Sequence, residues 1–250
     1  MPLFIGCAGW SLRKDIVEYF PVDGTHLQRY ASRLNCVEIN SSFYRAHRKK
    51  TYERWAESTP ADFRFSVKFP KQITHVNRLI DVDGDTQRFV DEISGLGSKL
   101  GPMLVQLPPS LQFDVSTIES FFRAIRQLVS SQIVCEPRHL SWFTPGAEAL
   151  MTEYCIGRVA ADPSIVPGAA TPGGCHQTGY FRWHGSPRMY YSAYDEQALN
   201  DLAKAASATS TAKDVWCIFD NTALGAAWRN AMTLFDMLHS SAQMDSRRCL

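Results

Sequence analysis

Short apolar runs alternate with helix-forming stretches along almost the whole chain of 250 residues. The runs are four to eight residues long, which is the length of a buried strand. Between them, apolar residues recur three and four positions apart, as on one face of a helix. Strands that alternate with helices form a parallel sheet covered by helices. We expect strands at residues 3–7, 36–40, 62–69, 103–107, 132–135, 157–161, 180–184 and 215–219.

Eight strands alternating with helices in 250 residues match the size of a (β/α)8 barrel. A doubly wound sheet, the competing fold, usually carries Gly-x-Gly-x-x-Gly after its first strand, and residues 6–11 lack that spacing. An irregular Gly/Pro-rich loop at residues 163–174 follows the sixth expected strand. The sequence therefore predicts the α/β class: a single (β/α)8 TIM-like barrel domain at residues 1–240, with a C-terminal tail at residues 241–250.

The charges of the chain nearly balance, with 26 Lys and Arg residues against 25 Asp and Glu residues. This balance produces no overall field that attracts a polyanion, and a hydrophobic content of 45% is ample for a core. No basic segment precedes a long apolar stretch near the N-terminus, so we expect neither a signal peptide nor a membrane span. The expected location is cytoplasmic, without a membrane partner.

Seven cysteines are spread over the chain, at positions 7, 36, 135, 155, 175, 217 and 249. No two are spaced as in the Cys-x-x-Cys motifs that bind metals or exchange disulfides. Several lie within apolar runs, where a thiol packs as a small hydrophobic group. We therefore interpret them as buried thiols.

Charged and polar side chains, whose burial costs free energy, gather where the fifth expected strand ends. Glu136, Arg138 and His139 directly follow the apolar residues 132–135. Barrel enzymes place their chemistry at the carboxyl ends of strands and in the loops that follow. Glu38 and Asn40 stand two apart on the second expected strand, so both point to one face and would reach the same barrel mouth as Glu136.

Eight blocks of sequence lie at or near expected strand ends: GCAGWS (6–11), VEINSSFYR (37–45), FRFSVK (63–68), ITH (73–75), QLPPS (106–110), EPRHLSWF (136–143), RWHG (182–185) and FDNT (219–222). In this order they resemble the blocks of the DUF72 family, also called YecE-like, over nearly the whole chain. The resemblance implies a TIM-like barrel, but the family has an unknown function. The chain departs mildly from the family: Cys7-Ala8 replaces the usual Thr-Ser, Pro137 stands where an aromatic residue is common, and Asp220 stands where a second Asn is usual.

Two carboxylates in one cleft oppose each other's ionisation, which separates their pKa values and divides acid and base roles between them. Glu38 and Glu136 are therefore candidate catalytic residues of a hydrolase or another acid–base enzyme, and glycoside hydrolysis is one reaction that uses such a pair. His139 and His184 are candidate proton shuttles. The alternative is a structural role, in which Lys68, Arg138 or Arg182 holds Glu38 and Glu136 in buried salt bridges that stabilise the barrel.

Cationic side chains at three strand ends would make the mouth locally positive, which suits a phosphate or carboxylate group. Aromatic side chains near the mouth would offer flat walls to a sugar ring or a base. We therefore expect a small anionic or sugar-like ligand. The candidate substrate-binding residues are Asn40, Tyr44, Lys68, His75, Gln106, Arg138, Trp142, Asp162, Arg182, Tyr194 and Asn221.

Two other functions stay open. The first is a metal-assisted phosphoesterase or nuclease-like barrel, in which nitrogen and oxygen atoms of side chains would bind a divalent metal ion. The candidate histidines do not share a local spacing typical of metal ligands, so the metal and any cofactor stay unknown. A basic segment at residues 45–54 would suit a non-catalytic protein that binds nucleic acid or an anionic metabolite. The candidate metal ligands are Glu38, His75, Glu136, His139, Asp162 and His184.

Overall fold

The computed structural model describes residues 2–209 and 212–248, with side chains up to residue 238, and its backbone alternates between strands and helices. The strands are β1 (Leu3–Ala8), β2 (Cys36–Ile39), β3 (Arg64–Lys68), β4 (Leu100–Gln106), β5 (Ile133–Glu136), β6 (Ile156–Arg158), β7 (Ala160–Asp162), β8 (Gly173–Gly174), β9 (Thr178–Trp183) and β10 (Asp214–Phe219). The helices are α1 (His26–Ala31), α2 (Ser41–Tyr44), α3 (Lys49–Glu57), α4 (Asp83–Ile93), α5 (Val115–Leu128), α6 (Pro145–Glu153), α7 (Glu196–Ala208) and α8 (Ala226–Arg248).

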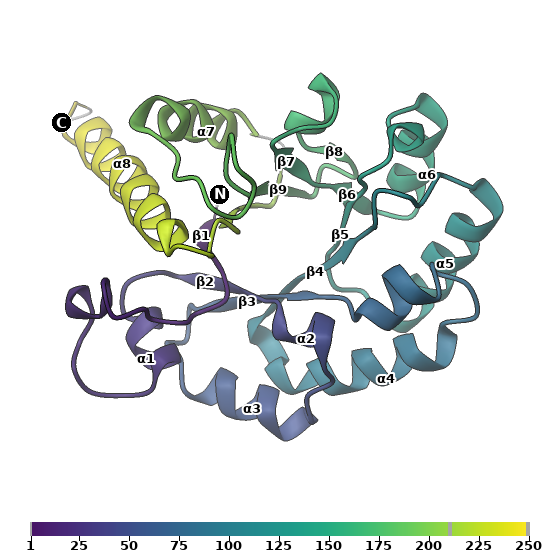
Figure 1. Cartoon of the computed structure of the whole chain (residues 1–250), viewed down its shortest axis with the longest axis horizontal. Helices are drawn as coiled ribbons and strands as arrows, with labels where there is room; N and C mark the ends of the chain where they lie inside the picture. The colour runs from purple at the N-terminus through teal and green to yellow at the C-terminus, as the bar shows by residue number, and fades with distance from the viewer. Residues whose placement is uncertain (1, 210–211, 249–250) are drawn as a thin grey trace.

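The strands form one sheet in the order β7-β9-β10-β1-β2-β3-β4-β5-β6-β8, in which β8 is antiparallel to β6 and the other neighbours are parallel. A single residue, Val159, separates β6, which pairs with β5, from β7, which pairs with β9. Residues 156–162 thus act as the sixth barrel strand and nearly close the sheet. In Figure 1 the strands surround the centre and the helices lie outside them. The predicted TIM-like barrel is confirmed.

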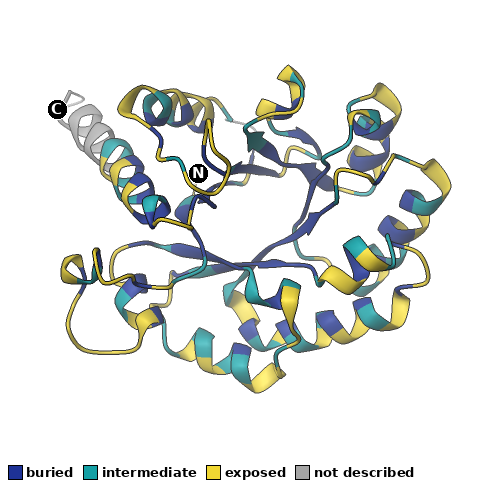
Figure 2. Cartoon of the chain, viewed as in Figure 1, coloured by how far each residue is buried: buried dark blue, intermediate teal, exposed yellow. Residues whose placement is uncertain are grey.

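Alternate residues of each strand build two separate cores. One apolar cluster fills the barrel interior and includes Cys36, Leu104, Val134, Tyr180 and Trp216. The residues next to these along each strand pack against the helices in a second, larger cluster. Figure 2 shows the consequence: the strands are mostly buried, and the helices are exposed on their outer faces. A two-residue period therefore decides which side chains reach the barrel interior.

The connections between strands differ in their helical content. Helix α4 lies in a connection for which the sequence pattern had not indicated a helix, and it buries Thr86, Phe89 and Ile93 at spacings of three and four. After β7, residues 163–177 contain a 3-10 turn at Pro167–Ala170 and the short strand β8. No helix in the described part of the chain is long and apolar enough to span a membrane. The division between a domain at 1–240 and a tail at 241–250 stays a prediction, and residues 249–250 lie outside the described residues.

Candidate functional site at the barrel mouth

The inward-facing residues change from apolar to charged toward the carboxyl ends of the strands. In β9, Tyr180 belongs to the apolar interior, and Arg182 and His184 follow it at intervals of two. In β5, Val134 is apolar and Glu136 follows two residues later. Parallel barrel strands end on one face, so these charged side chains converge on the same mouth.

Arg182 lies at the centre of this mouth and is fully buried. Its Nη2 lies 2.8 Å from Glu38 Oε1 and 3.0 Å from Asp220 Oδ2, and its Nη1 lies 3.1 Å from Glu136 Oε2. One guanidinium thus bonds three carboxylates that come from β2, β5 and the end of β10. We call Glu38, Glu136, Arg182, His184 and Asp220 the mouth cluster.

Glu38 has both carboxylate oxygens engaged. Arg182 Nε donates to Glu38 Oε2 over 3.0 Å, and Tyr180 Oη donates to the same oxygen over 2.8 Å. The Tyr180 hydroxyl also lies 2.9 Å from Ser66 Oγ. Burial and the charge of Glu38 raise the pKa of Tyr180 well above its usual range, so this phenol stays protonated and keeps its donor role. Glu38 therefore accepts hydrogen bonds in a fixed geometry and is closed to solvent.

Glu136 is similarly surrounded by donors. Its Oε1 accepts from Arg138 Nε over 2.8 Å and from Gln106 Nε2 over 3.3 Å, and it lies 3.0 Å from His184 Nε2. Burial alone would raise the pKa of Glu136, but His184, Arg138 and Arg182 outweigh it and hold this pKa well below its usual range. Glu136 is therefore a carboxylate at neutral pH.

His184 is held between two carboxylates. Its Nδ1 lies 3.0 Å from Asp220 Oδ2, and its Nε2 lies 3.0 Å from Glu136 Oε1 and 3.2 Å from Arg138 Nη2. The imidazolium form donates to both carboxylates, whereas the neutral form donates to only one of them, Asp220 or Glu136. The nitrogen without a proton then faces a guanidinium, Arg182 Nη1 at Nδ1 or Arg138 Nη2 at Nε2, so either ring nitrogen has a donor when it loses its proton.

Lys68, at the end of β3, is a largely buried lysine that faces the Phe43 ring. Its ammonium makes no hydrogen bond or salt bridge to any residue in the described ranges, and its Nζ lies 4.2 Å from the centre of the Phe43 ring. Burial and the charge of Arg182 lower the pKa of Lys68 to about 8, against the opposing influence of Glu38, Glu136 and Asp220. Lys68 is still mainly protonated at pH 7, and its hydrogen-bonding capacity is unused.

Asn40 stands beside Lys68. The pairing of β2 with β3 places Ile39 opposite Val67, and Asn40 and Lys68 are the next residues on each strand. Ser42 Oγ donates to Lys68 O over 2.6 Å and fastens the start of α2 to the end of β3. The Oδ1 of Asn40 is buried and has no hydrogen-bond partner among the described residues. Two neighbouring strand ends therefore both carry unsatisfied polar groups.

His75 completes this side of the mouth from the loop after β3. Its ring lies 4.9 Å from the Phe43 ring, edge to face, and its Nδ1 lies 2.9 Å from Thr74 Oγ1. Burial, followed by the charges of Lys68 and Arg138, lowers the pKa of His75 to about 4. His75 is therefore neutral at pH 7 and adds a polar group without adding charge.

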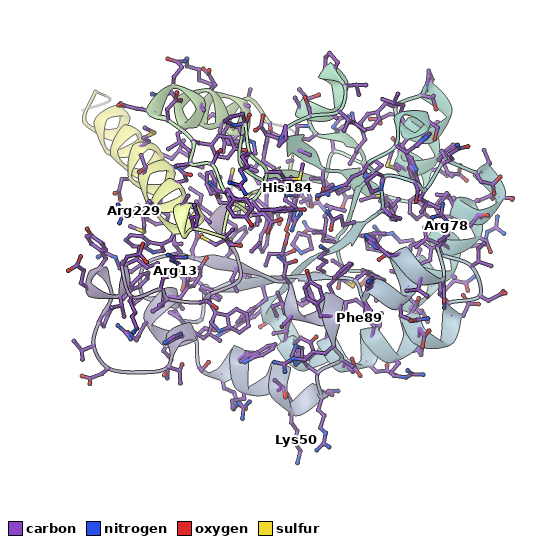
Figure 3. The ribbon with its side chains drawn as sticks, in the orientation of Figure 1. Arg13, Lys50, Arg78, Phe89, His184 and Arg229 are labelled. Atoms are coloured by element: carbon purple, nitrogen blue, oxygen red, sulfur yellow. The ribbon has the colours of Figure 1, made fainter. Side chains whose placement is uncertain are left out.

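A pocket of about 490 Å³ adjoins the mouth on the outer side of Phe43. It is lined by residues of α2, of the loop after β3 and of α4, including the exposed Tyr44 and Arg45. The rest of the basic segment at 45–54 is less closely associated with the mouth. Figure 3 labels Lys50 at the outer edge of the molecule and His184 close to the middle of the ring of strands.

Three sequence candidates lie outside the mouth cluster. Trp142 is fully buried, and its Nε1 donates to Leu111 O over 2.9 Å, so it packs in the core. His139 accepts at Nδ1 from the backbone N of Ser141 and caps the 3-10 turn Leu140–Trp142. Tyr44 is 79% exposed and lies beside the pocket rather than over the cluster.

Three further candidates brace the loop after β9. Tyr194 Oη donates to Asp162 Oδ1 over 2.6 Å and accepts from the backbone N of Gly185. Asn221 Nδ2 donates to Ser192 O over 2.9 Å. These bonds hold the segment that follows His184 and make no direct contact with Arg182 or Glu136.

Three residues at the site were absent from the sequence-based set: Phe43, Tyr180 and Asp220. Asp220 directly follows β10 and stands two residues after the inward-facing Ile218, so its position at a strand end was a usable signal. Tyr180 precedes Arg182 by two and shares its inward face. The position of Phe43 depends on how α2 folds over the mouth, which local sequence does not reveal.

In the mouth cluster, the carboxylates that could bind a metal ion are already paired with cationic side chains of the protein. Within the described ranges, no group of three or more His, Cys, Asp and Glu side chains is arranged to hold a metal ion. The carboxylates of the cluster are bonded instead to Arg182, Arg138 and His184. A divalent ion would have to displace these bonds.

Known proteins resemble the chain in sequence. YecE of Escherichia coli K12 is 31% identical over 147 residues, which are 58% of this chain and 52% of YecE, so the chain matches about half the length of that relative. YunF of Bacillus subtilis 168 is 24% identical, over 94% of both chains. Both relatives carry the designation UPF0759.

Solved structures of related proteins share the fold. A DUF72 family protein from Thermotoga maritima MSB8 has a TM-score of 0.80 and 25% identity, covering 96% of this chain and all of the other. One from Enterococcus faecalis V583 has a TM-score of 0.80 and 23% identity over 95% of both chains. The model of the family described as "Protein of unknown function DUF72" matches residues 4–248. The chain belongs to the DUF72 family.

Proposed function

We propose that the barrel mouth binds a small anionic molecule, such as a sugar that carries a phosphate or carboxylate, and acts on it by proton transfer through His184. The observation that supports this most strongly is the pair Asn40 and Lys68: the buried Oδ1 of Asn40 has no hydrogen-bond partner among the described residues, and Lys68 is a largely buried residue whose ammonium is in no ion pair with them. Buried polar groups in folded proteins are nearly always bonded. A ligand with an anionic group and a hydroxyl would satisfy both.

Lys68 supplies the charge for anion binding. A charge-assisted hydrogen bond to phosphate or carboxylate is stronger than a neutral one, and burial protects it from screening. Arg138 lies on the other side of Glu136 and is about one-fifth exposed, so its guanidinium also reaches the mouth. His75, neutral at pH 7, offers a hydrogen bond at the same rim.

His184 supplies proton transfer. In the neutral state its Nε2 is a base that takes a proton, and in the imidazolium state the same nitrogen returns it. Asp220 lies 3.0 Å from Nδ1 on the other side of the ring from Glu136 and helps to fix its orientation. This positioning role resembles the way a buried carboxylate orients a catalytic imidazole in other enzymes.

Glu38 and Glu136 have positioning roles in this proposal rather than the acid–base roles that the sequence suggested. Each accepts several hydrogen bonds, and both lie against Arg182. The lowered pKa of Glu136 keeps it ionised through the neutral range, so it has no proton to donate there. Together the two carboxylates hold Arg182 and, through Glu136, the imidazole of His184.

A panel of sugar phosphates and sugar acids, followed by NMR in deuterated water, tests the proposal, because it detects hydrolysis and solvent-deuterium incorporation alike. We expect turnover of at least one member, and a loss of about 100-fold or more in His184→Gln, since a general acid–base residue contributes roughly 10²- to 10⁴-fold. His26→Gln, a change on the exposed face of α1, is the matched control. Undiminished turnover in His184→Gln, or saturable binding with no turnover across the panel, would overturn the enzymatic assignment.

A further inference from the structure

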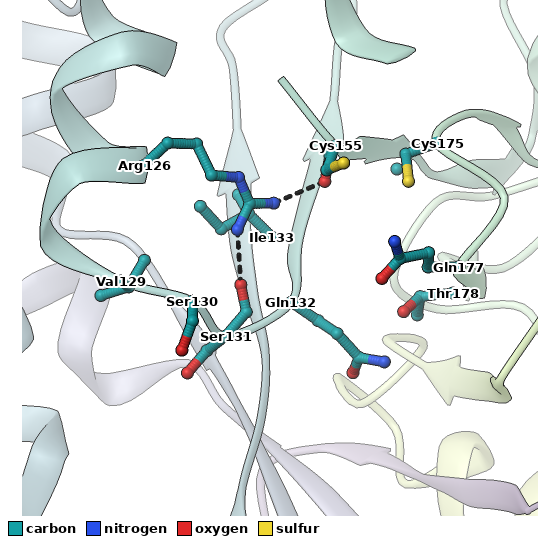
Figure 4. Close-up of a pocket in the computed structure, with 11 residues that line it drawn as sticks. Arg126, Val129, Ser130, Ser131, Gln132, Ile133, Cys155, Cys175, Gln177 and Thr178 are labelled. Carbon is teal, nitrogen blue, oxygen red and sulfur yellow. Dashed lines mark hydrogen bonds between the residues drawn. The ribbon is translucent and has the colours of Figure 1, made fainter. Parts of the chain in front are cut away.

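A second site lies at the opposite end of the barrel from the mouth, where Cys155 and Cys175 line a pocket of about 310 Å³. Cys155 directly precedes β6, and Cys175 directly follows β8 and leads into β9. Figure 4 shows the two side chains next to each other on one wall of this pocket. Among the described cysteines, Cys155 is exposed and Cys175 half-buried, whereas the others are buried. These are therefore the two described thiols that reagents in solution reach.

The backbone holds the two cysteines within bonding range. Strands β6 and β8 pair through Gly157 and Gly174, and the backbone N of Cys175 donates to Ile156 O over 2.9 Å, so Cys175 lies opposite Ile156 and Cys155 is its diagonal neighbour. Adjacent antiparallel strands lie about 5 Å apart, and a disulfide spans Cα separations of about 4.4 to 6.8 Å. The two thiols also interact electrostatically, since Cys155 raises the pKa of Cys175. Cys155 leaves the regular ladder with a φ of +52°, and Figure 4 shows its side chain next to that of Cys175, which allows the two sulfurs to approach each other.

Arg126 gives the pocket a positive charge beside the thiols. Its Nη1 donates to Ser131 O over 2.7 Å and its Nη2 donates to Cys155 O, which fixes the guanidinium against the pocket wall (Figure 4). Burial, as the main cause, raises the pKa of Cys175, which favours its protonated form. Cys155 is the more exposed of the two and lies beside the guanidinium of Arg126, and both conditions favour reaction of a thiol with a reagent in solution. Cys155 is therefore the nucleophile of the pair.

We propose that Cys155 and Cys175 form a reversible oxidation site, in which Cys155 reacts with a peroxide and Cys175 resolves the product as a disulfide. The Cys155 thiolate attacks hydrogen peroxide, the O–O bond breaks, hydroxide leaves and a sulfenic acid forms. The Cys175 sulfur then attacks the Cys155 sulfur and forms the S–S bond, while the sulfenic oxygen leaves as water with the thiol proton. Two electrons pass from the two thiols to the peroxide, and a reducing thiol reverses the reaction.

The disulfide would close a loop that contains the irregular segment after β7. Residues 155–175 include β6, β7, the 3-10 turn Pro167–Ala170 and β8. A cross-link across a loop of this size restricts the unfolded chain and raises the temperature of unfolding, by roughly 5 °C for a domain of this length. The site is independent of the mouth cluster, so it stands whether or not the proposed enzymatic function holds.

Peroxide titration with peptide mapping tests the proposal. The native protein is treated with a small excess of hydrogen peroxide, alkylated under denaturing conditions and digested. We expect a peptide pair joined through Cys155 and Cys175, lighter by two hydrogen atoms and separated by dithiothreitol. Recovery of both residues as alkylated thiols, or of Cys155 oxidised without the cross-link, would overturn the proposal. Buried Cys36 and Cys217 are internal controls that stay alkylatable.

Two single variants assign the roles. Cys175→Ser removes the resolving thiol, so Cys155 should accumulate as a sulfenic acid that dimedone traps. Cys155→Ser removes the nucleophile, so the same peroxide dose should leave Cys175 reduced and the unfolding temperature unchanged. Dimedone labelling of Cys175 in Cys155→Ser at the wild-type rate would contradict the assigned order. The peptide map also separates this pair from any bond to Cys249, which lies outside the described residues.

Discussion

Arg182 and Glu38 are joined across the barrel interior by three hydrogen bonds: Nη2 donates to Oε1 over 2.8 Å, and Nε donates to Oε2 over 3.0 Å and to Oε1 over 3.2 Å. They are 144 positions apart in sequence, and β2 and β9 are not neighbours in the sheet. Both side chains are fully buried. The barrel is therefore held at its mouth by an ion pair that the sheet itself does not supply, and Arg182 also contacts Glu136, His184 and Asp220.

Arg182→Gln should destabilise the fold strongly, because it leaves three carboxylates near one another without their shared cation. Removing one partner of a buried ion pair costs about 3 to 5 kcal/mol in the free energy of unfolding, which urea denaturation measures. Arg123→Gln is the matched control: it breaks the exposed pair with Glu119 on α5 and should leave the urea midpoint nearly unchanged. Equal effects of the two variants would show that the buried network contributes no special stability.

Glu136→Gln should alter how stability depends on pH. The folded-state pKa of Glu136 lies below its ordinary value of 4.5, so its ionic stabilisation is fully present above about pH 4.5 and is lost as the pH falls through the folded-state pKa. The stability difference between wild type and Glu136→Gln should therefore be largest near pH 7 and shrink below pH 4.5. Urea denaturation at pH 7, 5, 4 and 3 measures it, and a difference that grows in acid would refute the assignment.

Asp220→Asn and Asp220→Leu should show whether the tautomer of His184 depends on the acceptor oxygen of Asp220 or on its negative charge. Asn keeps an oxygen acceptor for Nδ1–H, whereas Leu removes it and leaves Glu136 as the nearby acceptor, on the Nε2 side. We expect ¹⁵N-labelled histidine spectra to show the neutral ring protonated at Nδ1 in wild type and Asp220→Asn, and at Nε2 in Asp220→Leu. His184→Gln identifies the resonance, and an Nε2-protonated ring in wild type would show that Glu136, and not Asp220, accepts the proton of the neutral ring.

Much of the mouth followed from the sequence, because parallel strands end on one face and side chains alternate with a period of two. That reasoning brought Glu38, Lys68, Glu136, Arg182 and His184 to one mouth, where the structure has them. The roles of these residues stay predictions. Which partner each charge selects, such as Arg182 for Glu38, depends on distances across the barrel that no local pattern contains.

Other positions were decided by tertiary packing. Trp142 follows a strand end as a binding residue would, yet its indole fills the space beside Leu111 and Phe113 because burying so large an apolar surface is favourable. Helix α4 carried its signal in Thr86, Phe89 and Ile93, but two acidic residues and a glycine open the segment and obscure the apolar face. Strand ends are thus easier to predict from sequence than the loops that cover them.

Anion binding at Lys68 should weaken as the pH rises through about 8. The pKa of Lys68 is lowered to about 8 in the free protein, and a bound anion would stabilise the ammonium and raise that pKa again. Sulfate is a suitable probe, because its charge stays constant from pH 6 to 10. Calorimetric titration should show constant affinity below pH 7 and a decline above pH 8 of up to about tenfold per pH unit. A flat profile through pH 10 would exclude Lys68 as the anion ligand.

The central claim is that Lys68 forms the anion site of the mouth, and titration of inorganic phosphate at pH 7 into three proteins tests it most directly. Wild type and Lys50→Met, which removes a lysine at the outer edge of the molecule, should bind phosphate equally. Lys68→Met should bind it about 10- to 100-fold more weakly, the loss expected for one charge-assisted hydrogen bond. Equal phosphate affinity in Lys68→Met and wild type, with the variant folded, would contradict the account.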